Sequence, residues 1–162
     1  MIRHGIAKFG RWFYGLDRPK QAAISVASAA GTAAVLYAFF PLIVVGAVLI
    51  VLLAHEGGHV VGAMATGTGH SLPVFIPLGV MAFGITVVQK SSIVRRVIIY
   101  ANGPLAGLIG SVALAFLGWW LALAALIRTA LVLSVWELAS ITIGSDGQKI
   151  RAALSERNMA CT

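Results

Sequence analysis

The sequence predicts an all-α polytopic membrane protein with about four transmembrane helices and a small β-hairpin between the second and the third. Of the 162 residues, 59% are hydrophobic and only 10% are charged, whereas a soluble domain carries about 25% charged residues. The mean hydropathy is +0.94, and a chain of this length cannot bury so much apolar surface within itself. The composition therefore excludes a soluble globular enzyme and a disordered chain. A single cysteine excludes a disulfide-rich secreted domain.

Residues 1–20 predict a cytoplasmic, basic amphipathic segment that lies in the membrane interface. Its apolar residues recur at spacings of four and three, which places them on one side of a helix, opposite basic residues. These apolar residues are Ile2, Ile6, Phe9, Phe13 and Leu16. The alternative is a cleavable signal peptide with residues 22–34 as its apolar core, although the apolar run continues beyond any such cleavage site.

The first long apolar run predicts two membrane spans. Residues 21–66 contain only three ionisable residues, and one helix of that length would be about 69 Å long, more than twice the ~30 Å hydrocarbon core. Pro41 is the strong helix breaker near the middle of this run. We therefore expect spans at residues 22–40 and 42–65.

The second long apolar run predicts the third and fourth spans, at residues 97–127 and 129–144. Trp119 and Trp120 are expected in an aromatic belt at the membrane interface. No internal repeat or linker divides the chain, so residues 21–162 are expected to form a single membrane-embedded domain.

The segment between the second and third spans predicts a β-hairpin. Residues 67–96 are too short and too polar at their ends for another span. Within them, residues 72–77 and 80–89 are rich in Val, Ile and Phe, and Leu78-Gly79 is the expected turn. The alternative is an irregular loop packed on the helices.

The basic residues predict that both termini lie in the cytoplasm. Of the twelve Lys and Arg residues, only Arg128 falls on the far side of a four-span topology, which is a positive-inside pattern. We therefore expect an integral, multi-pass protein of a prokaryotic cell membrane. The net charge of +7 suits contact with the anionic headgroups of the lipid bilayer, and no regular basic face indicates a nucleic acid partner.

The sequence His55-Glu56-Gly57-Gly58-His59 is a candidate metal site in the second span. On a helix, residues i and i+4 share one face, so the two imidazoles can reach one metal ion. Glu56 is the candidate general base, because it can accept a proton from water activated by the metal. A charged residue in the middle of a membrane costs about 2.5–3.5 kcal/mol, so ionisable residues there are functional by default. The alternative is a buried polar cluster that holds helices together.

A catalytic zinc ion requires a third protein ligand, and Asp146 is the best candidate. The predicted topology brings the end of the fourth span to the same side of the membrane as His55 and His59. Glu137 lies nine residues earlier and is expected to hydrogen-bond in the bundle or to orient a ligand. His70, in the loop after the motif, is expected to be a turn histidine.

Three separated motifs together resemble the site-2 protease family of intramembrane zinc metalloproteases. They are the His-Glu-x-x-His motif, Asn102-Gly103-Pro104 at the start of a span, and Ser145-Asp146-Gly147 at the end of the last one. The resemblance covers residues 42–155, about the extent of the expected catalytic core. It implies a minimal member with three core helices, a β-hairpin after the first, and the aspartate of the Asp-Gly motif as third metal ligand.

The chain departs from that family at two places. Gly107 stands where the family usually has an asparagine, and the stretch before Asp146 lacks the family's Asn-Pro pair. Asn102 and Glu137 are the candidates to take their place, in substrate binding or in support of the ligands.

These observations predict an intramembrane zinc metalloendopeptidase with one Zn²⁺ per chain. It would hydrolyse peptide bonds in or near the transmembrane segments of membrane protein or peptide substrates. The alternative is a non-enzymatic membrane subunit that retains the metal site for assembly or for binding a partner. A transporter is a third class, but the chain is short and has no internal repeat.

Overall fold

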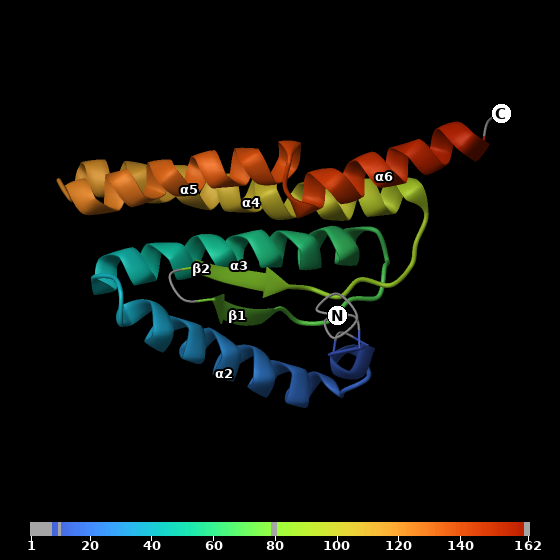
Figure 1. Ribbon diagram of the computed structural model, residues 1–162, viewed down its shortest axis with the longest axis horizontal. Helices are drawn as coiled ribbons and strands as arrows, with labels where there is room; N and C mark the ends of the chain where they lie inside the picture. Colours follow the sequence, from blue (N-terminus) through green and yellow to red (C-terminus); the bar gives the residue numbers. More distant parts are fainter. Residues whose placement is uncertain (1–7, 10, 79–80, 161–162) are drawn as a thin grey trace.

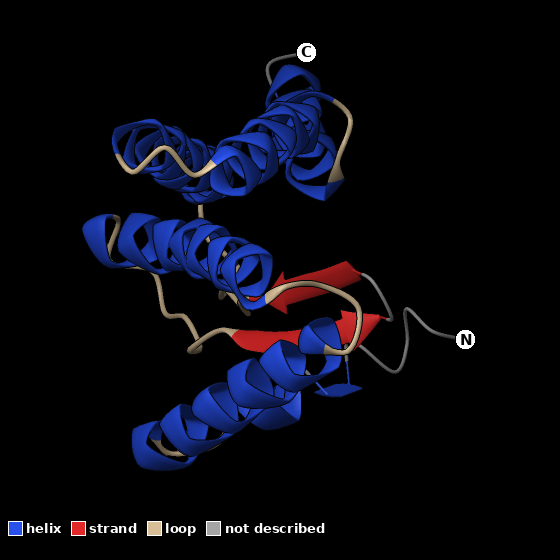
Figure 2. Ribbon diagram, turned by 90° about the vertical axis from the view of Figure 1, so that its left-hand side faces the viewer, coloured by secondary structure: helices blue, strands red, loops and turns tan. Residues whose placement is uncertain are grey.

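The computed structural model describes residues 8–9, 11–78 and 81–160, which are mostly helical (Figure 1). The elements in chain order are α2 (Arg18–Tyr37), α3 (Leu42–Ala65), β1 (Val74–Leu78), β2 (Met81–Ile85), α4 (Ile93–Trp120), α5 (Ala124–Thr142) and α6 (Ser145–Ala160). Helices α4, α5 and α6 form one layer, α3 packs beneath them, and the hairpin lies between α3 and α2 (Figures 1 and 2).

Three helices of the described chain are long and apolar enough to cross a membrane. They are Leu42–Ala65, Ile93–Trp120 and the segment Ala124–Ser155, which joins α5 to most of α6. In the most apolar part of each, only 33%, 33% and 17% of the residues are buried within the protein, so most of their surface faces outward. These features fit a membrane protein. Helix α2 does not reach the same apolar character, so the fourth span stays a prediction.

Helix α3 confirms the predicted span at 42–65, with Pro41 as its N-cap residue. The predicted boundary near Arg128 is wrong: α4 ends at Trp120, and the turn to α5 occupies residues 121–123. Ala122 makes this turn with a φ of 53°, a left-handed conformation that usually calls for glycine. Because neither glycine nor proline marks the turn, the apolar run continues through it without a signal.

The predicted hairpin is confirmed, and the irregular loop is excluded. The strands are antiparallel, with Phe75 opposite Gly84 and Leu78 opposite Met81. The predicted turn residue Leu78 therefore ends β1, whereas Gly79 lies outside the described residues. Residues 1–7 and 10 of the predicted amphipathic segment lie outside the described residues, whereas residues 8–9 and 11–14 are helical and Phe13 is 1% exposed.

The outer edge of β1 is closed by a polar stripe of α2, formed by Gln21, Ser25 and Ser28. The spacing of four and three places these side chains on one helix face. Gln21 Oε1 accepts a hydrogen bond from the backbone N–H of Leu72 at 3.0 Å, and Ser28 Oγ accepts one from Phe75 at 3.0 Å. Ser25 Oγ donates to the carbonyl of Pro73. Helix α2 therefore takes the hydrogen-bonding positions that another strand would use.

Helices α3 and α4 approach closely because α3 presents glycine at the contact. A Cβ atom added to Gly58 would overlap the backbone carbonyl of Asn102. Toward the other end of these helices, Ala47 and Val51 of α3 pack with Leu114 of α4 and with Leu126 and Ala130 of α5 in a small apolar core. The motif histidines begin one helical turn beyond Val51, so this packing sets their position.

Candidate metal centre

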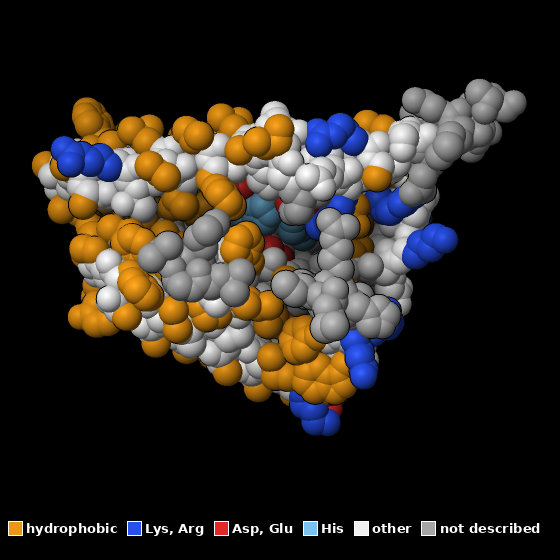
Figure 3. Space-filling model, in the orientation of Figure 1, with side chains coloured by type: hydrophobic (Ala, Val, Ile, Leu, Met, Phe, Trp, Pro, Cys, Tyr) orange, Lys and Arg blue, Asp and Glu red, His pale blue; other side chains and the backbone are white. Residues whose placement is uncertain are grey.

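His55, His59 and Asp146 converge where α3, α4 and the start of α6 meet. Each offers one ligand atom, and these atoms lie within 4.8 Å of one another. Asp146 Oδ2 is 3.1 Å from Nε2 of His55 and 3.5 Å from Nε2 of His59. His59 and Asp146 are 6% and 2% exposed. In the space-filling view, histidine and acidic side chains are visible in a hollow beneath the layer of α5 and α6 (Figure 3).

The second nitrogen of each imidazole is held by an acceptor. Nδ1 of His59 lies 2.8 Å from the carbonyl oxygen of Ile99, and Nδ1 of His55 lies 2.7 Å from Glu137 Oε2. A carbonyl oxygen and a carboxylate accept hydrogen bonds, so each Nδ1 carries the proton in a neutral ring. Both Nε2 atoms then present lone pairs toward Asp146 Oδ2. A cation shared by the two Nε2 atoms and Oδ2 would satisfy all three, so the group could hold a metal ion.

Asp146 owes its position to the break between α5 and α6. Helix α5 ends at Thr142, and α6 begins again at Ser145, which places Asp146 in its first turn. A Cβ atom added to Gly147 would overlap the carbonyl of Ile141, so the glycine allows the two helices to meet closely. Lys149, one turn further, donates to Oδ1 of Asp146 at 3.2 Å and leaves Oδ2 directed at the histidines.

Glu137 reaches the same histidine as Asp146, although the sequence placed it about 13 Å deeper along a helix. The imidazole of His55 lies between the two carboxylates, with Nδ1 toward Glu137 and Nε2 toward Asp146. Glu137 is 3% exposed and packs on Gly107, where an added Cβ would lie 2.5 Å from its Cδ. The glycine that replaces the expected asparagine therefore makes room for this carboxylate.

Glu56 does not belong to the converging group. Its carboxylate is directed at the hairpin, where Thr86 Oγ1 donates to Oε2 at 2.6 Å. Sequence reasoning missed Thr86, because 30 residues separate it from Glu56 and nothing marked this threonine within an apolar segment.

The other two candidates lie at the edge of the site or outside it. Asn102 donates from Nδ2 to the carbonyl of Ile98 in its own helix at 2.9 Å, while the adjacent Gly103 makes room for the ring of His59. His70 forms an isolated bridge with Val88 beyond the hairpin, and it is not among the residues that converge on Asp146.

The fold and the site together define a membrane protein with a buried His-His-Asp group that could hold a metal ion. Comparison with protein-family models, with curated proteins and with solved structures found no match to this chain.

Proposed function

We propose that this protein is an intramembrane zinc metalloprotease that hydrolyses peptide bonds in or near transmembrane segments. The observation that carries the proposal is the combination of three converging ligand atoms with a neighbouring glutamate that is not one of them. A metal site with a structural role alone has no need of a base beside its ligands. This combination is typical of hydrolytic zinc sites.

The donor set suits zinc. Tetrahedral zinc with bonds of ~2.0–2.1 Å sets its ligand atoms about 3.3 Å apart. The two distances from Asp146 Oδ2 to the histidines, 3.1 and 3.5 Å, bracket that value, and the three ligand atoms all lie within 4.8 Å of one another. His55, His59 and Asp146 would hold the ion through two nitrogens and one oxygen. Zinc bound there would supply Lewis acidity toward a peptide carbonyl and toward water.

Glu56 would move the protons of the reaction. Its carboxylate takes a proton from water as the water oxygen attacks the carbonyl carbon of the substrate. The proton then passes to the peptide nitrogen as the C–N bond breaks, which yields an amine and a carboxylic acid; the acid then gives its remaining proton to the amine, so the products are an ammonium group and a carboxylate. Glu137 keeps the proton on Nδ1 of His55 and so keeps the opposite nitrogen available as a ligand.

The substrate would bind as an extended segment beside β2. A transmembrane helix must unwind before cleavage, and an unwound segment can replace its lost hydrogen bonds at a free strand edge. The edge of β1 is closed by α2, and Pro73 and Pro77 provide no N–H there. Phe75 donates outward to Ser28, so the opposite residue, Gly84, directs its own backbone groups away from β1. The edge of β2 that would receive the substrate is therefore the edge to which the backbone groups of Gly84 point.

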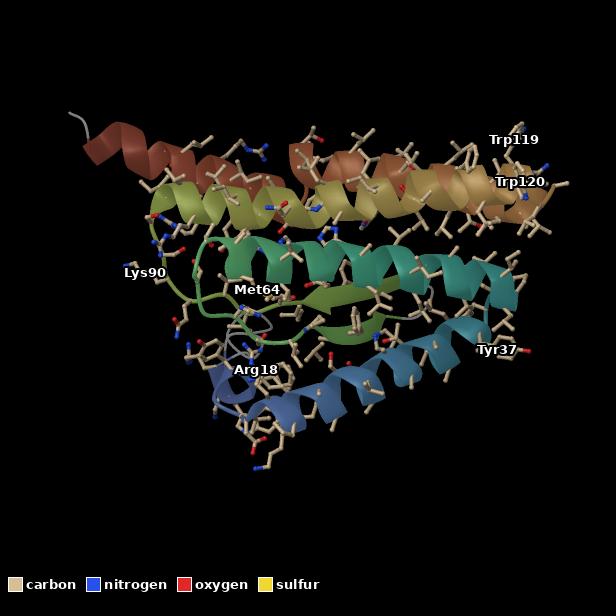
Figure 4. The ribbon with its side chains drawn as sticks, turned by 180° about the vertical axis from the view of Figure 1, so that it is seen from behind. Arg18, Tyr37, Met64, Lys90, Trp119 and Trp120 are labelled. Atoms are coloured by element: carbon tan, nitrogen blue, oxygen red, sulfur yellow. The ribbon has the colours of Figure 1, made fainter. Side chains whose placement is uncertain are left out.

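We also propose four spans with both termini in the cytoplasm, in a prokaryotic cell membrane. Arg18 and Lys90 lie at one end of the molecule, whereas Tyr37, Trp119 and Trp120 lie at the other (Figure 4). Basic residues favour the cytoplasmic side, and aromatic residues favour the interface. Helix α2 would be the fourth span, with its polar stripe satisfied by the hairpin and not by water.

The test is cleavage by the purified protein in liposomes, with a library of quenched fluorescent transmembrane peptides and with bound zinc measured in parallel. Glu56→Gln should keep zinc near one ion per chain, while the rate falls by about 10²- to 10⁴-fold, as expected for loss of an acid–base group. Asp17→Asn, the same acid-to-amide change at the exposed N-cap of α2, should leave both unchanged. A Glu56→Gln variant that cleaves normally contradicts the protease. A wild-type protein that binds zinc but cleaves no peptide would favour a membrane subunit.

A further inference from the structure

The carboxylate of Glu56 is held by the hairpin and not by its own helix. Thr86 Oγ1 donates to Oε2 of Glu56 at 2.6 Å, and Glu56 is only 5% exposed. A glutamate side chain has three rotatable bonds, so its place in the helix sequence does not by itself fix where the carboxylate lies. Thr86 supplies that restraint from a separate part of the chain.

Hydrogen bonds hold the backbone in place on both sides of Thr86. Before it, Gly84 pairs with Phe75 in the hairpin. After it, the N–H of Val87 donates to Ser71 Oγ at 3.0 Å, and the N–H of Ser71 donates to the carbonyl of Val87 at 2.8 Å. Ser71 is fully buried. The hydroxyl of Thr86 is therefore presented from backbone that is hydrogen-bonded on both sides, directly after β2.

Gly84 in β2 and Thr86, which directly follows β2, both lie against Glu56. A Cβ atom added to Gly84 would overlap Cγ, Cδ and Oε1 of Glu56. The glycine leaves the space that the glutamate occupies, and the threonine two residues later binds its carboxylate. Few positions remain for the side chain.

From this geometry we propose that Thr86 is a positioning residue for the general base. Its bond to Oε2 leaves Oε1 of Glu56 to take the proton from the attacking water. The residue that follows β2 would thereby fix the group that cleaves a peptide bound beside β2. This inference rests on the proposed protease function for its kinetic consequence, but not for the contact itself.

The kinetic test compares Thr86→Val, which removes the hydroxyl at nearly constant shape, with Thr86→Ser, which retains it. A hydrogen bond to a charged group corresponds to a factor of roughly 10 to 100. We expect kcat of Thr86→Val to fall by that factor with KM within about twofold, and we expect Thr86→Ser to recover most of the rate. Thr129→Val, whose hydroxyl bonds Ala125 in its own helix, is the matched control and should change neither parameter. An unchanged kcat, an effect on KM alone, or loss of zinc in Thr86→Val would overturn the proposal.

A second measurement does not depend on cleavage. Thermal unfolding in detergent is compared for Thr86→Val, Glu56→Gln and the double variant. If the two side chains interact, the fall in Tm of the double variant differs from the sum of the single falls. The cycle of Thr129→Val with Glu56→Gln should be additive. An additive Thr86 cycle overturns the contact even in an active enzyme, whereas coupling in a protein that cleaves nothing would overturn the protease and retain the contact.

Discussion

The two halves of this molecule are joined by different kinds of contact. In the metal layer of α3, α4, α5 and α6, helices approach through glycine, and side chains from several helices meet at His55 and Asp146. In the hairpin layer of α2, β1 and β2, helix side chains bind strand backbone, as Ser28 binds Phe75. Metal binding should therefore depend on helix spacing in the first layer and be insensitive to the second. Glu56 bridges them, because it belongs to α3 and accepts a hydrogen bond from Thr86 after β2.

The largest expected effect belongs to the metal layer. Asp146→Ala removes the oxygen that lies near both imidazoles, so the purified variant should lose most of its bound zinc, and its activity with it. Metal analysis after dialysis measures this loss, and Asp17→Ala on the exposed start of α2 is the control. Retention of zinc in Asp146→Ala together with its loss in Glu137→Ala would show that the third ligand is misassigned.

A smaller effect is expected for the carboxylate behind His55. Loss of such a partner typically lowers metal affinity by about 10- to 100-fold, and we expect this for Glu137→Ala in competition with a zinc chelator. Gly107→Ala should weaken zinc similarly, because its methyl group displaces Glu137. In a protein that already carries Glu137→Ala, Gly107→Ala should lower the zinc affinity little further. Gly46→Ala, which meets no neighbouring atom, is the control.

The spacing of α3 and α4 can be tested with adjacent glycines. Gly58→Ala would overlap the carbonyl of Asn102, and such overpacking typically costs about 1–3 kcal/mol. A Cβ atom at Gly57 meets nothing within 4 Å. We therefore expect thermal unfolding in detergent to show a lower Tm for Gly58→Ala and no decrease for Gly57→Ala. Equal Tm values for the two variants would argue against a close helix contact at Gly58.

The smallest effect on zinc binding is expected in the hairpin layer. Ser28→Ala leaves the N–H of Phe75 without its acceptor, which should lower the free energy of unfolding by about 1–3 kcal/mol at most. Zinc content should stay at the wild-type value. Ser155→Ala removes a hydroxyl that bonds only its own helix and serves as the control. A fall in zinc content for Ser28→Ala would mean that the two layers are not independent.

The parts of the structure that could be predicted are those determined by residues close together in the sequence. Pro41 fixed the start of α3, and the i, i+4 spacing brought His55 and His59 to one face. The turn at Ala122 could not be predicted, because its conformation is imposed by the packing of α4 on α5 and not by a turn-forming residue.

Contacts between residues far apart in the sequence could not be predicted either. Glu137 lies 82 residues from His55, and Thr86 lies 30 residues from Glu56. The position of a residue along a helix predicts its depth in the membrane. It does not predict which residue of a neighbouring helix or strand the side chain contacts. Only the assembled bundle and hairpin specify those pairs.

The break between α5 and α6 also affects the order in which the protein matures. Asp146 follows His55 by 91 residues, so a ribosome-bound chain inserted only as far as α5 holds the two histidines without the aspartate. The complete group of His55, His59 and Asp146 forms only when the start of α6 docks against α3 and α4. A chain that ends before α6 would therefore lack the complete group of candidate ligands.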